Sequence, residues 1–170
     1  MPNWCKGVLK VRGKKKDLLN FLNNGIERCG YSRDINDDYT KYPLGVKVDD
    51  WGCYFVEKTD SEHDSWLYIK DSRRCFIEEN IEWDLEDLED YDEEICYLDI
   101  KQAWRLEPDY FKEISKIYNI DFRIMGFECG MQFVQEVEVI KGNITLNKVI
   151  KYIDYNWEAY DPRLGGWCFK

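Results

Sequence analysis

The sequence has little histidine and proline and no long apolar run. His63 is the only histidine among 170 residues, and it lies in the polar stretch 60–65. A lone histidine in a polar turn is not placed as the base of a Cys–His or Ser–His pair. No apolar stretch approaches the roughly 18–20 residues that span a bilayer. The first residues lead directly into a charged stretch, which is not typical of a signal peptide. We therefore expect no membrane association and a cytoplasmic protein.

The cysteines are numerous but widely spaced. They occupy positions 5, 29, 53, 75, 96, 129 and 168, and no two are closer than 21 positions. This spacing excludes the CxxC-type knuckles that bind zinc or an iron–sulfur cluster. Their number is odd, so we expect free thiols, and Cys75 and Cys96 stand in apolar strand-like runs that favour burial. The sequence predicts neither a metal nor another cofactor.

Basic charge is in the minority, and the imbalance is local. The chain has 34 acidic and 24 basic residues, a net charge of −10. Eleven acids and no base lie between Glu78 and Glu94, which leaves 23 acidic against 24 basic residues elsewhere. We call residues 78–94 the acidic segment. Its charges are Glu78, Glu79, Glu82, Asp84, Glu86, Asp87, Glu89, Asp90, Asp92, Glu93 and Glu94.

Three interpretations of the acidic segment remain open. It is a solvated helix or loop docked by Ile81, Leu85 and Leu88, a surface for a basic partner that imitates nucleic acid, or a divalent-cation site. The cation site lacks the Asp-x-Asp-x-Asp-Gly spacing of calcium loops. Direct nucleic-acid binding is disfavoured, because the basic runs at 14–16 and 73–74 are short and the aromatic signature of RNA-binding sheets is missing.

Apolar periodicity predicts one α+β domain over residues 1–170. Strands are expected at 5–12, 45–48, 53–57, 65–70, 74–78, 95–104, 120–124, 133–139 and 144–146, and helices at 17–29 and from 108 to 118. Residues 149–157 are compatible with a further helix. This order favours a ferredoxin-like split βαβ fold, with a mostly antiparallel sheet and helices on one face. The acidic segment would be an insertion, and the C-terminal region an added hairpin or helix.

Two blocks of sequence suggest a family. The first is Met1-Pro2-Asn3-Trp4-Cys5 with a following helix, and the second runs from Leu98 through Ala103-Trp104 and Pro108 to Glu128-Cys129-Gly130 and Phe133. Over residues 1–22 and 97–142, which are 68 of 170 residues, the chain resembles the YubB ferredoxin-like family of phage- and plasmid-borne proteins. The match departs at Arg105-Leu106-Glu107-Pro108, where that family has a serine and paired prolines. The resemblance implies the fold and an origin in a mobile element, but no established activity.

The sequence contains no recognisable catalytic set, so the main hypothesis is a non-enzymatic inhibitor. It would bind a host protein with a basic groove, for example a nucleic-acid-handling defence enzyme as an anti-CRISPR protein does. The expected contact residues are Glu82, Asp84, Glu86, Asp87, Glu89, Asp90, Asp92, Glu93 and Glu94. One alternative is a ligand-binding or hydrolytic pocket at the Glu128 hairpin, with Trp104 and Phe133. Another is a scaffold component of a phage or plasmid system.

Overall fold

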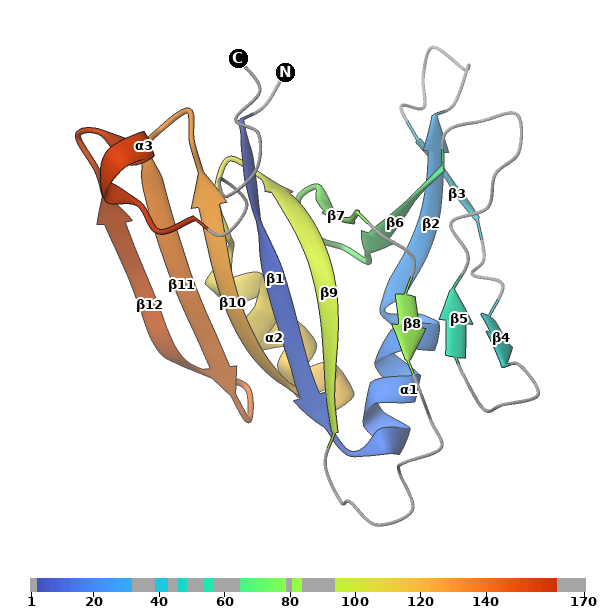
Figure 1. Cartoon of the computed structure of the whole chain (residues 1–170). Helices are drawn as coiled ribbons and strands as arrows, with labels where there is room; N and C mark the ends of the chain where they lie inside the picture. Colours follow the sequence, from blue (N-terminus) through green and yellow to red (C-terminus); the bar gives the residue numbers. More distant parts are fainter. Residues whose placement is uncertain are drawn as a thin grey trace.

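The computed structural model describes residues 3–31, 39–42, 46–48, 54–56, 65–78, 81–83 and 94–161. The chain is a mixed α and β protein (Figure 1). Its elements are β1 (Trp4–Gly13), α1 (Lys15–Asn24), β2 (Ile26–Tyr31), β3 (Tyr39–Tyr42), β4 (Val46–Val48), β5 (Tyr54–Val56), β6 (Ser65–Ile69), β7 (Cys75–Ile77), β8 (Ile81–Trp83), β9 (Glu94–Ala103), α2 (Pro108–Tyr118), β10 (Asp121–Glu128), β11 (Phe133–Ile140), β12 (Asn143–Lys151) and α3 (Tyr155–Glu158).

In the described part of the chain, one large sheet holds nine strands in the order β12-β11-β10-β1-β9-β7-β6-β2-β3. Every neighbouring pair in it is antiparallel. The first strand lies between β9 and β10, although these two strands begin 90 and 117 residues later in the chain. A smaller sheet has the order β4-β5-β8.

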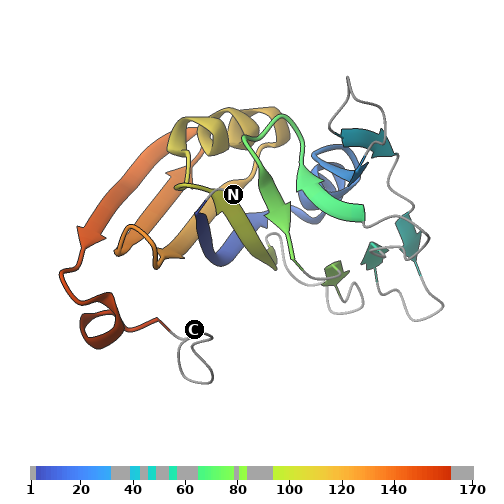
Figure 2. The ribbon, with the colours of Figure 1, turned by 90° about the horizontal axis from the view of Figure 1, so that it is seen from above.

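Helices α1 and α2 cover one face of the large sheet. Phe21 of α1 and Phe111 of α2 both lie edge-to-face against Phe122 of β10, with ring centroids 5.8 and 5.5 Å apart. Alternate residues of β1, including Leu9 and Val11, are fully buried beneath these helices. Figure 2 shows both helices on this side, whereas α3 lies on the other. Neither α1 nor α2 covers the opposite face of the central strands, and we call that face the open face.

Sequence signals account for the ends of the two main helices. Pro108 occupies the first turn of α2, where its missing N–H is tolerated, and Asn119 ends the helix in the left-handed conformation with φ 54°. The predicted strands at 65–70 and 74–78 are confirmed as β6 and β7. The expectation of an α+β fold with a mostly antiparallel sheet is confirmed as well.

Three expectations were wrong in detail. The first helix was expected to reach residue 29, but it ends at Gly25, and Ile26 begins β2. The asparagines at 23 and 24 are weak helix formers, and Gly25 caps the helix by donating its N–H to the Phe21 carbonyl oxygen. Pairing with β11 likewise overrides the helical spacing of 149–157, because β12 continues to Lys151 and α3 is one turn long.

The third correction concerns the start of the acidic segment. Ile81 was expected to belong to a helical stripe, but it opens β8, which pairs with β5. Pairing with a neighbouring strand supplies backbone hydrogen bonds that an isolated short helix lacks. Residues 84–93 lie outside the described residues, and with them all the acids from Asp84 to Glu93.

The thiol predictions are confirmed where the structure describes them. Cys5, Cys75, Cys96 and Cys129 are free, and the first three are buried. Burial raises the pKa of Cys96 to about 12 and raises that of Cys75 further, so neither is a ready nucleophile at neutral pH. His63 lies outside the described residues. None of the described helices is both long and apolar enough to traverse a bilayer.

Candidate functional site: the open face of the large sheet

The open face has a simple side-chain pattern, because directly opposed residues of an antiparallel sheet share a face. The register of β10, β1 and β9 gives four rows across the three strands. In that strand order the rows are Phe127–Lys6–Lys101, Met125–Val8–Asp99, Arg123–Lys10–Tyr97 and Asp121–Arg12–Ile95. Apolar and charged side chains are therefore mixed on one exposed surface.

Four large apolar side chains on this face are exposed to solvent. Tyr97 is 59% exposed, and Val8, Ile95 and Met125 are between 41% and 43% exposed. They come from three adjacent strands, and Val8 and Met125 are directly opposed. Clustered exposed apolar residues on a sheet face are typical of binding surfaces.

A groove of about 590 Å³ lies in this face. Its volume is within the usual range for sites that take small ligands or side chains of a partner, roughly 300–1,000 Å³. The residues that line it are Lys6, Gly7, Val8, Lys10, Glu78, Asp99, Arg123, Met125, Phe127 and Tyr160. A smaller hollow of about 110 Å³ continues on the other side of Lys10 and Arg123, which line both.

The C-terminal region forms one wall of the groove. Tyr155 is buried against Phe127 and Val134 on the open face, and its hydroxyl donates a hydrogen bond to Asp161 at 2.8 Å. Burial first, and then the Asp161 carboxylate, raise the pKa of Tyr155 far above its usual range. The backbone N–H of Tyr155 also donates to the side-chain oxygen of Gln132. Tyr160, five residues after Tyr155, lines the groove and is 98% exposed.

Glu78 joins two lysines at the β9 end of the groove. Its Oε1 lies 3.2 Å from Lys6 Nζ and 3.1 Å from Lys101 Nζ. Burial alone would raise the pKa of Glu78, but hydrogen bonds from Lys101 and Lys6 outweigh it and hold the pKa below its ordinary value. Glu78 is the first residue of the acidic segment. Its two lysine contacts fix its side chain at the open face.

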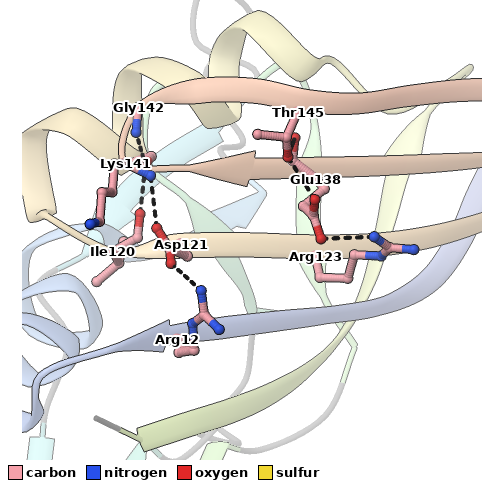
Figure 3. A network of polar contacts seen from close by, with 9 residues as sticks. Arg12, Ile120, Asp121, Arg123, Glu138, Lys141, Gly142 and Thr145 are labelled. Atoms are coloured by element: carbon pink, nitrogen blue, oxygen red, sulfur yellow. Dashed lines mark hydrogen bonds and ion pairs between the residues drawn. The ribbon is translucent and has the colours of Figure 1, made fainter. Parts of the chain in front are cut away.

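A polar network continues across β1, β10, β11 and β12 (Figure 3). Arg12 Nη2 lies 2.6 Å from Asp121 Oδ2, and the other oxygen of Asp121 accepts the backbone N–H of Lys141 at 2.8 Å. Glu138 accepts hydrogen bonds from Thr145 at 2.6 Å and from Arg123 at 2.8 Å. These two bonds lower the pKa of Glu138. The network fixes the acidic side chains beside the groove.

The residues predicted at the Glu128 hairpin are not part of this groove. Glu128 is 2% exposed, and its Oε1 and Oε2 accept the backbone N–H groups of Gly130 and Met131 at 2.8 and 2.5 Å. Phe133 lies in the main core, while Trp104 is 51% exposed with φ 70°. The geometry of Glu128 supports a role in holding the turn between β10 and β11.

Sequence reasoning did not identify Lys6, Lys10 and Arg123 as neighbours. The alternation of β1 does place Lys6, Lys10 and Arg12 opposite to Leu9 and Val11, but it does not tell which strands flank β1. Of the predicted acidic contact residues, Glu94 is described at the start of β9, and Glu82 is described only as part of β8. In the described ranges, no group of three or more His, Cys, Asp or Glu residues is arranged to hold a metal ion.

Searches against protein-family models, curated proteins and solved structures find no match to this chain. The YubB resemblance therefore stays a hypothesis, carried by its sequence motifs.

Proposed function

We propose that this chain is a non-enzymatic binding protein that recognises its partner through the open face of the large sheet. The observation that carries the proposal is the groove on that face, which Val8 and Met125 line and beside which Tyr97 is exposed on β9. The other face of the sheet is covered by α1 and α2. Apolar side chains supply area for binding, and the ion pairs at the edges favour one orientation of a partner. A binding role needs no nucleophile or base at the groove.

The proposed biological setting follows from the sequence motifs. A mobile genetic element that encodes a small binding protein gains most from a stoichiometric inhibitor of a host protein, and this is the activity we propose. The fold we propose for it is ferredoxin-like: β9, α2 and β10 form a split βαβ unit around β1. The hairpin of β6 and β7 would then be an addition between β9 and β2.

The experiment is an affinity capture from host lysate with matched surface variants. The open-face variant carries Tyr97→Ser and Met125→Ser, and the control variant carries Ile117→Ser on α2, where the side chain is 70% exposed. The captures include nuclease, so that bridging nucleic acid does not contribute. We expect a protein that is retained by wild type and by the control but lost with the open-face variant. Equal retention by all three would place the contact elsewhere and contradict the proposal.

A second candidate surface is the acidic segment, which would bind a basic groove of the partner. The observation that favours it is the concentration of eleven acids in 17 residues of a chain that is otherwise nearly neutral. Electrostatic steering by such a segment speeds association and makes it sensitive to salt. Asp87→Asn with Asp90→Asn should then flatten the salt dependence of partner binding. Asp109→Asn with Glu113→Gln, which removes two exposed acids of α2, should not.

A further inference from the structure

The open face contains two pairs of like charges in direct opposition. Lys10 of β1 faces Arg123 of β10, and Lys6 of β1 faces Lys101 of β9. Directly opposed side chains have Cβ atoms about 4.5–5.5 Å apart, and like charges in this position destabilise a sheet. Glu78 compensates the lysine pair by contacting both of its members. The Lys10–Arg123 pair has no such shared acid among the described residues.

The two side chains of this pair turn away from each other. Lys10 reaches toward β9, where its Nζ lies 5.4 Å from the ring centroid of Tyr97. Arg123 reaches toward β11, where it contacts Glu138 at 2.8 Å and Glu136 at 3.6 Å. Among the described residues, Lys10 forms no ion pair within 4.0 Å. Lys10 and Arg123 line the groove together with Val8 and Met125, so both cations lie beside apolar side chains.

We propose that Lys10 and Arg123 form the anion-recognition point of a ligand site in this groove. The ligand carries a carboxylate or phosphate beside an apolar group. The anion lies between the two cations, and the apolar group contacts Val8, Met125 and Tyr160. A guanidinium has five N–H donors, so Arg123 keeps donors beyond those that contact Glu136 and Glu138. This site uses the same groove as the partner surface proposed above, but its test needs no partner protein, so either proposal can fail without the other.

The acids that line the groove determine the orientation of the ligand. Glu78 is already engaged by two lysines, whereas Asp99 is exposed on β9 opposite Val8. Asp99 repels an anion from the row of Val8, so the anionic group is directed to the next row, where Lys10 faces Arg123. The apolar group is then left over Val8 and Met125 rather than over polar surface.

The test is an NMR titration of the full chain with four probes that separate charge from apolar area. Phenylbutyrate and phenyl phosphate combine an anion with a ring, phenylbutylammonium reverses the charge, and inorganic phosphate lacks the ring. We expect both aromatic anions to bind about tenfold more tightly than the ammonium probe, which is the effect of one charge-assisted contact. The shifted amides should include those of Val8, Lys10 and Met125. A clear preference between the two aromatic anions identifies which acid group the site favours.

Matched variants test the assignment to Lys10. Lys10→Gln should weaken phenylbutyrate about tenfold, and Lys10→Arg should restore binding because the positive charge returns. Lys16→Gln removes the same charge from exposed α1 and should leave the affinity unchanged. Thermal unfolding and the spectrum of each variant verify its fold.

Three results would overturn this site. They are no saturable shift with either aromatic anion, equal binding of the ammonium probe, and an unchanged affinity in Lys10→Gln. A fourth result, tight binding of inorganic phosphate, which lacks the ring, would also contradict the site, because the apolar contacts would then contribute nothing.

Discussion

The buried carboxylate of Glu128 gives the sharpest stability prediction, because both of its oxygens accept backbone N–H groups of the following turn. Glu128→Gln keeps the size of the side chain but replaces one acceptor oxygen by an NH₂ group. One of the N–H donors of Gly130 and Met131 then faces another donor. Glu128 is only 2% exposed, so the new NH₂ group is held against that donor.

The expected loss follows from the energy of one such bond. A hydrogen bond to a charged group contributes about 1.5–3 kcal/mol, and Glu128→Gln removes one such bond. We expect Glu128→Gln to lower the free energy of unfolding by about 2 kcal/mol. For a chain of this length, 1 kcal/mol corresponds to roughly 2–4 °C in Tm, so the expected decrease is roughly 4–8 °C.

Two measurements check this prediction. Thermal unfolding by circular dichroism gives the change in Tm, and amide hydrogen exchange should show faster exchange at Gly130 and Met131 than in the wild type. Glu113→Gln is the control, since Glu113 is 62% exposed and contacts only Lys116 three residues away. Its Tm should equal that of the wild type. A Glu128→Gln variant with unchanged Tm and unchanged exchange would refute the structural role, and loss of an activity at unchanged Tm would indicate a chemical one.

Two further predictions concern titration and thiol chemistry. The pKa of Glu78 is lowered in the folded chain, so its bonds to Lys6 and Lys101 stabilise the fold above the ordinary pKa of 4.5, and this stability is lost as the pH falls through the folded-state pKa. The difference in Tm between wild type and Glu78→Gln should therefore be largest at neutral pH and shrink as the pH falls below 4.5; a difference that grows on acidification would contradict this. Among the described cysteines, Cys129 is exposed and Cys96 is buried with a pKa of about 12. When the protein is treated with a thiol reagent, the number of fast-reacting thiols should therefore fall by one in Cys129→Ser and stay the same in Cys96→Ser.

Much of the fold could be predicted from local patterns. The alternation around Leu9 and Val11 predicted β1, and the proline at 108 with its helical apolar spacing predicted α2. The failures occurred where tertiary pairing decides between two local options. Residues 149–157 have helix-compatible spacing, yet the backbone of residues 149–151 pairs with β11. That pairing is with the preceding strand of the hairpin, which the helical spacing of 149–157 does not take into account.

The candidate site was less predictable than the fold because it depends on register. Lys10 and Arg123 are 113 positions apart, and only the antiparallel pairing of β1 with β10 makes them neighbours. A shift of one residue would move Arg123 to the buried face and bring Phe122 to the open one. The burial of Phe122 against Phe21 and Phe111 prevents this shift, so the same packing that stabilises the core also forces the two cations together.

The cost of this forced pairing is reduced in different ways at the two ends of β1. Lys6 and Lys101 share Glu78, an acid from outside the central three strands. Arg123 instead pairs with acids on β11, and Lys10 is left with an aromatic ring. A cation over a tyrosine gains only about 0.5–1 kcal/mol at an exposed site, less than a charge-assisted hydrogen bond. A bound anion would therefore stabilise the positive charge of Lys10 more than the Tyr97 ring does. For that reason we expect a ligand in the groove beside Lys10.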